Sequence, residues 1–292
     1  MKIRYAVVLT LIILSITAIL SSCSAAAEAP SSAAEIPLPT AAAPRLAAHD
    51  APDYVTFDGT HYCTELTILY LADMGLQDED IIPLQYMTNL TWLALYGNEI
   101  SDLTPLSGLV NLTDLYLDEN RISDLTPLRG LTNLTKLSIW ENQISDLTPL
   151  SCLANLTELY LDDNQISDLE PLSGLANLTY LSLWGNQISN LEPLSGLVNL
   201  TNLVLIDNQI SDLTQIENLI NLRELYLGEN QISDTAPISS FTHLTSLDLS
   251  GNPLSCLTPL STLTNLTFLF LHNNQISDWS PVAHVENVSG RP

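Results

Sequence analysis

A row of carboxylates is the first group of residues in this chain that could do chemistry. It recurs every 22 residues, with asparagine or cysteine at two places: Asp102, Asp124, Asp146, Asp168, Asn190, Asp212, Asp234, Cys256 and Asp278. Hard cations prefer clustered oxygen ligands, so calcium binding is one interpretation. The interpretation that we favour is that each aspartate, with the serine before it, hydrogen-bonds the backbone of a turn.

Catalytic motifs are not found in the sequence. There is no H-E-x-x-H, C-x-x-C or G-x-S-x-G and no glycine-rich phosphate loop. The five histidines are scattered, and His61 near Cys63 has no further ligand close in sequence. His243 takes a position that is asparagine in the neighbouring repeats, which favours a structural role. We predict that the protein is not an enzyme and holds neither a metal nor a cofactor.

The apolar residues follow the same period of 22, and they predict the elements that position these side chains. Nine asparagines close the phrase leucine-x-x-leucine-x-leucine-x-x-asparagine: Asn98, Asn120, Asn142, Asn164, Asn186, Asn208, Asn230, Asn252 and Asn274. This repeat predicts one short strand per unit, stacked into a solenoid. An asparagine amide has two donors and an acceptor, so the nine side chains are expected to form an internal ladder between coils.

A second phrase, Q-I-S-D-L-T-P-L or a variant of it, follows each of these asparagines. Thr148 before Pro149 indicates a helix cap followed by proline at the first helical position. Few residues remain before the next strand, so we expect a short 3₁₀ turn. The fold prediction is an α/β solenoid. It is a right-handed coil with a short parallel strand on the concave face and a 3₁₀ or short helical turn on the convex face of each repeat.

The repeat unit N-L-T-x-L-x-L-x-x-N-x-I-S-D-L-T-P-L resembles the leucine-rich repeat family and is similar to that of the internalins, bacterial surface proteins. The resemblance covers about residues 65–288. We predict an N-terminal cap with a degenerate first repeat over 53–89, nine repeats over 90–287 and a tail over 288–292. The immunoglobulin-like domain of the internalins is not recognisable, so their role in host-cell invasion is not carried over.

The N-terminal segment resembles a bacterial lipoprotein signal peptide over residues 1–22. Lys2 and Arg4 precede an apolar run, and the run ends in a lipobox-like Leu-Ser-Ser before Cys23. The resemblance implies that Cys23 is lipidated, and two or more acyl chains give stable membrane attachment. An ordinary signal peptide cleaved near Ala27 and an uncleaved anchor are the alternatives.

The segment 23–52 is dominated by alanine, proline and serine, and we predict that it is a disordered tether. With a lipidated N-terminus, this tether implies a protein of the bacterial cell envelope that lies outside the cytoplasm. Membrane contact is expected only through the lipid anchor.

The charge balance restricts the class of partner. The chain has 33 acidic and 8 basic residues and a formal net charge of −25. Nucleic acid is excluded, because its binding depends on basic residues that displace counterions. A cationic protein matches this surface better. We expect a monomer that binds a protein partner.

The strand positions that vary between repeats predict the binding surface. By the period of two, they lie together on the concave face. The residues expected to contact a partner are Trp92, Tyr96, Tyr116, Asp118, Trp140, Glu158, Tyr160, Asp162, Tyr180 and Trp184. Trp140, Tyr160, Tyr180 and Trp184 are the predicted anchors, because aromatic rings are usual anchors of interfaces. Asp118, Glu158 and Asp162 are predicted to steer association by charge.

Three interpretations of this surface stay open. Recognition of a protein is the one we favour. The aromatic strip could instead stack sugar rings, which would make the protein an adhesin for glycans or matrix. Aromatic residues also favour exposed strand positions for structural reasons alone, and the protein would then be an envelope spacer without a specific ligand.

Overall fold

The computed structural model describes residues 52–291. The predictions for the signal peptide, for lipidation of Cys23 and for nearly all of the tether concern residues outside this range. Among the described residues, no helix combines the length and the apolar character that crossing a membrane requires.

The fold is built on one parallel sheet of eleven short strands, each hydrogen-bonded to its neighbour in sequence. The strands are β3 (Ile68–Tyr70), β4 (Trp92–Ala94), β5 (Asp114–Tyr116), β6 (Lys136–Ser138), β7 (Glu158–Tyr160), β8 (Tyr180–Ser182), β9 (Asn202–Val204), β10 (Glu224–Tyr226), β11 (Ser246–Asp248), β12 (Phe268–Phe270) and β13 (Asn287–Ser289). From β4 to β12 each residue pairs with the one 22 positions later, for example Leu159 with Leu181. Equivalent side chains therefore form straight columns across the sheet.

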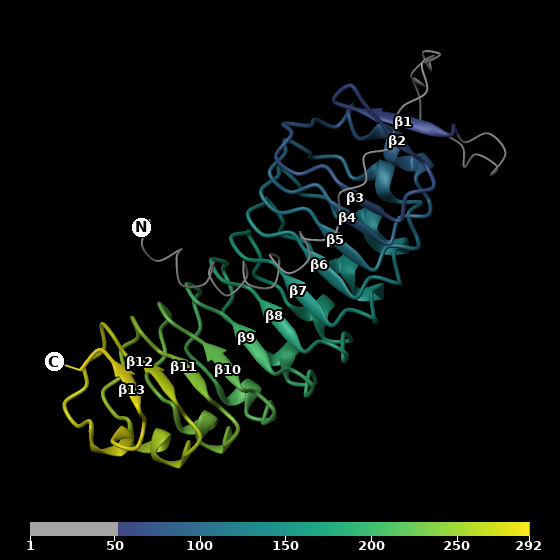
Figure 1. Ribbon diagram of the computed structural model, residues 1–292. Coiled ribbons are helices and arrows are strands. Elements are labelled where there is room, and N and C mark those ends of the chain that lie inside the picture. Colours follow the sequence, from purple (N-terminus) through teal and green to yellow (C-terminus); the bar gives the residue numbers. More distant parts are fainter. Residues whose placement is uncertain (1–51, 292) are drawn as a thin grey trace. The chain divides into compact units, whose positions relative to one another are not determined.

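A 3₁₀ helix follows each strand from β3 to β12 and lies on the opposite, convex side of the coil (Figure 1). The helices are η1 (Ile82–Tyr86), η2 (Thr104–Leu106), η3 (Thr126–Gly130), η4 (Thr148–Cys152), η5 (Glu170–Leu172), η6 (Glu192–Leu194), η7 (Thr214–Ile216), η8 (Ala236–Ser240), η9 (Thr258–Thr262) and η10 (Ser280–Val282). The predicted solenoid, with strands inside the curve and 3₁₀ turns outside, is confirmed.

The helical turns are capped differently from the prediction. Thr148 is itself the first residue of η4, and its backbone N–H donates to Asp146 Oδ1 at 2.8 Å. The prediction that Thr148 is the cap was therefore wrong, because the capping oxygen comes from the aspartate two residues earlier. The aspartates of the row accept the turn-backbone bonds that we favoured from the sequence, but these bonds do not involve the serines before them. Within residues 52–291, no three histidine, cysteine or acidic side chains come together where a metal could be held.

The leucine and isoleucine side chains of successive coils form one continuous core. Leu159 and Leu161 are fully buried, and so are Ile166 and Leu172 from the outer part of the same coil. No single coil could remove these side chains from water, so the stacking of coils stabilises the fold.

The two ends of the solenoid are covered in different ways. At the N-terminal end, β1 (Tyr54–Phe57) and β2 (Thr60–Cys63) form an antiparallel hairpin that buries Val55 and Phe57 against the core. At the C-terminal end, Trp279 takes the place of a core leucine and is partly buried. Strand β13 crosses the predicted boundary between the repeats and the tail at residue 287, so the sheet continues one strand further than expected.

Candidate functional site

The asparagine ladder holds the end of every strand in place. Asn164 is buried, and its Oδ1 accepts a hydrogen bond from Ile144 N at 2.9 Å in the preceding coil. Its Nδ2 lies 3.0 Å from Ile139 O of that coil and 3.2 Å from Leu161 O of its own. Equivalent bonds are made by Asn98, Asn120, Asn142, Asn186, Asn208, Asn230, Asn252 and Asn274. The bends beside the sheet are thus tied to the coils on both sides.

The outward side chains of β3 to β12, with the residue two positions after each strand, make up a surface that we call the strand face. Its aromatic rings are mostly half-buried, because they pack against one another across neighbouring strands. Ring centroids are 5.8 Å apart for Tyr70 and Tyr96 and 5.3 Å apart for Trp92 and Tyr116. Tyr160 and Tyr180 are closest, at 4.7 Å. Distances in this range are favourable for aromatic pairs, and they fix the rings in position.

Lys136 occupies the middle of this aromatic row, and the sequence analysis did not include it among the site residues. Its Nζ lies 5.7 Å from the centroid of Tyr116 and 5.3 Å from that of Tyr160. The same atom pairs with Glu158 Oε2 at 2.9 Å. Burial lowers the pKa of Lys136, but the hydrogen bond to Glu158 and the charges around it raise that pKa overall. The only signal in the sequence was a basic residue among acidic and aromatic neighbours.

Asp118 has a structural role in place of the predicted steering role. The side chain is buried, and Oδ1 accepts hydrogen bonds from Ser138 Oγ and from Trp140 N at 3.1 Å. Burial raises the pKa of Asp118 to about 7, although the bonds from Ser138 and Trp140 oppose this shift. The prediction that Asp118 steers a partner by charge was wrong, because its carboxyl group is enclosed between two coils.

Asp162 repeats this arrangement two coils further on. Its Oδ1 accepts from Ser182 Oγ and from Trp184 N at 2.8 Å. Burial raises the pKa of Asp162 to about 6, against the effect of these bonds. Asp162 is half-buried, and these bonds hold its carboxyl group against the next coil. Glu158, which is also half-buried, is paired with Lys136.

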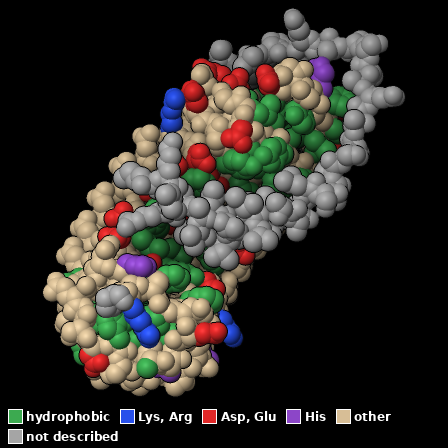
Figure 2. Space-filling view, turned by 60° about the vertical axis from the view of Figure 1, so that its left-hand side comes forward, with side chains coloured by type: hydrophobic (Ala, Val, Ile, Leu, Met, Phe, Trp, Pro, Cys, Tyr) green, Lys and Arg blue, Asp and Glu red, His purple; other side chains and the backbone are tan. Residues whose placement is uncertain are grey.

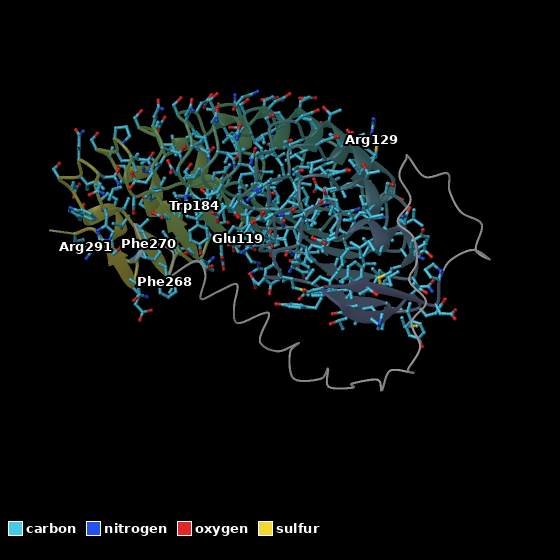
Figure 3. All side chains as sticks on the ribbon, turned by 90° about the horizontal axis from the view of Figure 1, so that it is seen from above. Glu119, Arg129, Trp184, Phe268, Phe270 and Arg291 are labelled. Carbon is cyan, nitrogen blue, oxygen red and sulfur yellow. The ribbon has the colours of Figure 1, made fainter. Side chains whose placement is uncertain are left out.

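A row of acids borders the strand face where each coil bends. The residue before each ladder asparagine has a positive φ, and five of these residues are acidic: Glu119, Glu141, Asp163, Asp207 and Glu229. Asp73, which also has a positive φ, holds the equivalent place before Met74 in the first coil. We call this row the acidic edge. Burial raises the pKa of Glu119, and the nearby Glu141 and Asp73 add to the effect. Figure 3 shows Glu119 and Trp184 on the side of the strands, with Arg129 on the side of the helical turns.

The predicted anchors are not a single cluster. Tyr160 and Tyr180 stack on each other near Lys136, while Trp140 and Trp184 lie beyond the strand ends, beside the acidic edge. Figure 2 shows acidic side chains lying among hydrophobic ones on the visible face of the solenoid. The arrangement presents apolar rings and carboxylates together.

A second row of asparagines lies at the surface of the coil, in the column of His243, and the sequence did not indicate which bonds these asparagines make. Asn155 Nδ2 donates to Thr132 O at 2.9 Å in the preceding coil. The equivalents are Asn111, Asn133, Asn177, Asn199, Asn221 and Asn265. His243 replaces an asparagine in this row, and its Nδ1 lies 3.1 Å from Ile220 O. The structural role predicted for His243 is confirmed.

Comparison with solved structures gives similar solenoids. Internalin F of Listeria monocytogenes is 29% identical over 80% of this chain and 91% of its own, with a TM-score of 0.53. Internalin C2 of the same species is 38% identical over 65% and 85%, with a TM-score of 0.60. The plant peptide hormone receptor RGFR1 in complex with RGF2 is 28% identical over 67% and 38%, with a TM-score of 0.54.

Comparison with family models identifies leucine-rich repeats over most of the solenoid. The model described as Leucine Rich repeats (2 copies) matches residues 88–130, 132–174, 176–219, 220–262 and 242–284. A search of curated proteins found no match. The matching family is a recognition scaffold and indicates no catalytic activity. With more than half of its length matched, the chain belongs to the leucine-rich repeat family.

Proposed function

We propose that the protein works by recognition and that its strand face binds a protein partner. The observation that supports this most directly is the row of paired aromatic rings between β4 and β8. Rings held by their neighbours on a rigid sheet lose little conformational freedom on binding, so more of the contact energy is available for affinity.

The charge of the surface favours a cationic partner. The acidic edge runs beside the strand face, and the chain as a whole carries a net charge of −25. Complementary charge accelerates association and disfavours acidic partners. Because Asp118 is buried and Glu158 is paired with Lys136, we assign the steering role to the acidic edge, above all to Glu119, Glu141 and Asp163.

Similar solenoids support a macromolecular ligand. The plant receptor RGFR1 was solved in complex with RGF2. This chain covers 38% of that receptor, so the likeness supports the class of ligand and leaves its identity open.

We also propose that Cys23 is lipidated and that residues 24–52 tether the solenoid to a membrane of the cell envelope. The lipobox-like sequence before Cys23 supports this proposal. In cells given labelled palmitate, wild-type protein is expected to carry label and to sediment with membranes. Cys23→Ala should lose both properties. A Cys23→Ala protein that keeps label and stays membrane-bound would disprove lipidation at this residue.

A photo-crosslinking experiment tests the recognition proposal. A photoreactive phenylalanine analogue replaces Tyr180 on the strand face in one variant and the exposed Ser173 at the end of η5 in the matched control. Irradiation of intact cells should give a protein adduct from position 180 and none of the same mass from position 173. Adding Trp140→Ala and Trp184→Ala should remove the adduct while the melting temperature stays near that of the parent.

Three results would contradict the proposal. Equal adducts from positions 173 and 180 would show that the strand face has no special role. An adduct that survives both tryptophan substitutions would remove the aromatic anchors from the mechanism. Binding to a neutral sugar array without any protein adduct would support the glycan interpretation in its place.

A further inference from the structure

A glutamate–tyrosine pair occurs twice on the strand face in the same geometry. In β7, Tyr160 Oη donates to Glu158 Oε2 at 3.0 Å. In β10, Tyr226 Oη donates to Glu224 Oε2 at 3.2 Å. All four side chains are half-buried. Strands β7 and β10 therefore each present a glutamate carboxylate that is hydrogen-bonded to a tyrosine.

The chain itself supplies a cation to the first pair. Lys136 is the residue of β6 that lies in register with Glu158. Its ammonium group contacts the Glu158 carboxylate at 2.9 Å and lies over the rings of Tyr116 and Tyr160. This arrangement combines a charge-assisted hydrogen bond with two cation–π contacts. The first pair thus shows that this surface can hold a cation beside a glutamate and over tyrosine rings.

The second pair has no such cation. In β9, Asn202 takes the register position of Lys136, facing Glu224 on one side and Tyr180 on the other. Asn202 is short and neutral, and its Oδ1 accepts a bond from the adjacent Thr201 Oγ1 at 2.8 Å. Among residues 52–291, the ion pairs are Arg121 with Glu99 and Lys136 with Glu158, so neither involves Glu224.

The surroundings of Asn202 favour a positive charge. Tyr180 is the residue of β8 in register with Asn202, and Tyr226 lies in β10, the neighbouring strand on the other side. Burial raises the pKa of Tyr180, and the negative charges of Asp162, Glu224 and Glu158 act in the same direction. The charged groups that act on Tyr226 are likewise acidic, namely Glu224 and Asp248.

We infer that a lysine or arginine side chain of the protein partner enters the strand face above Asn202, where it pairs with Glu224 between the rings of Tyr180 and Tyr226. The inference rests on the proposed function and specifies the partner's chemistry. The partner segment must be exposed and must present a basic residue to the centre of the sheet. The position of Lys136 is closed to such a residue, because the chain has already filled it.

Two short peptides test this site without knowledge of the partner. Both are acetylated and amidated pentapeptides with four glycines, and the central residue is lysine in one and norleucine in the other. In an NMR titration at millimolar concentration, the lysine peptide should shift the Asn202 side-chain amide and the Glu224 backbone signal. The norleucine peptide should not. Equal shifts from both peptides, no shift from either, or uniform shifts along the whole acidic surface would overturn the inference.

Three substitutions sharpen the test. Glu224→Gln should weaken binding of the lysine peptide roughly tenfold, which corresponds to about 1.4 kcal/mol of binding free energy. Asn202→Lys builds in the missing cation and should abolish the shift of the Glu224 backbone signal, whereas Asn202→Ala should keep that shift. Lys136→Asn removes the internal cation and should create a second binding position beside Glu158. Binding that persists in a folded Asn202→Lys variant would disprove the inference.

The two proposals can fail separately. If the lysine peptide binds at Asn202 but photo-crosslinking at Tyr180 yields no protein, recognition of a protein fails and the cation site stands. If crosslinking identifies a partner whose affinity is the same for wild type and Asn202→Lys, recognition stands and the cation site is wrong.

Discussion

The inner and the outer side of the coil use the same hydrogen bonds in different surroundings. Inside the curve, Asn164 and Asp118 are buried and bond to the backbone of a neighbouring coil. Outside it, Asn155 and Asp124 make bonds of similar length while exposed to water. Breaking a buried bond strands polar groups that water cannot reach, whereas exposed groups can exchange their partner for water. We therefore expect the contribution of each bond to the free energy of unfolding to depend on whether its atoms are buried, and not on its length.

The comparison also bears on function. Residues on the strand face differ from repeat to repeat, but two of them, Asp118 and Asp162, each join one coil to the next. Each of these carboxyl groups holds a serine and the backbone of a tryptophan in the next coil. The tryptophans predicted as anchors are thus positioned by buried acids, so recognition and stability are coupled on the inner side.

The largest expected effect is a pH dependence that separates the inner acids from the outer ones. The pKa of Asp118 is raised from 3.8 to about 7, and that of Asp162 to about 6. Between pH 4 and these values the unfolded chain is ionised and the folded chain keeps the protons, so the free energy of unfolding falls as pH rises. The slope is about 1.4 kcal/mol per pH unit for each carboxyl.

The double variant Asp118→Asn and Asp162→Asn checks this effect, because an amide oxygen can still accept the serine and tryptophan bonds. Urea unfolding of both proteins is measured between pH 4.5 and 7. Wild type should lose stability relative to the variant as pH rises through this window. Parallel stability curves would mean that the two carboxyl groups are ionised in the folded protein.

The second effect is the loss of one buried amide. Asn164→Ala removes the acceptor for Ile144 N and the donor to Ile139 O, and it leaves both backbone groups inside the protein. We expect the free energy of unfolding to fall by about 1–3 kcal/mol. Urea denaturation followed by circular dichroism measures the change. An unchanged midpoint would mean that the ladder contributes nothing to stability.

The third effect concerns an outer acid, and its pH dependence has the opposite sign. Hydrogen bonds from Thr126 lower the pKa of Asp124, so this carboxylate stabilises the fold above its ordinary pKa and loses that contribution as pH falls. Asp124→Ala should cost about 0.5 kcal/mol at pH 7, the low end for a helix cap because the group is exposed. Thermal melts are compared with wild type at pH 7 and pH 3, and the difference in melting temperature should be smaller at pH 3.

The sequence predicts the inner scaffold well because burial repeats with the period. Leu159 and Leu161 could be assigned to the core from alternation alone, and the 22-residue spacing of Asn164 and its equivalents indicates a stacked row. The role of Asp118 depends on Ser138 in the next coil, so one repeat read by itself cannot reveal it. The alternation of acid with serine and tryptophan over two repeats was the available signal.

The outer side was harder to predict, because exposed polar residues have several equivalent uses. Thr148 and Asp146 were both reasonable caps for η4, and the choice between them depends on the backbone angles at the start of the turn. The cation site above Asn202 was not predictable either. It emerges only when Lys136 and Asn202 are seen at the same register position beside matching glutamate–tyrosine pairs.

The smallest expected effect completes the comparison of the two asparagine rows. Asn155→Ala removes a 2.9 Å bond to Thr132 O that is as short as those of Asn164, but both groups are reached by water. The free energy of unfolding should change by less than about 0.5 kcal/mol, the usual range for exposed positions. Asn155→Ala and Asn164→Ala are measured side by side in urea. The two bonds differ mainly in burial. An equal loss in the free energy of unfolding would therefore show that the contribution of each asparagine depends on the stacking geometry of the coil, and not on whether buried polar groups lose their partners.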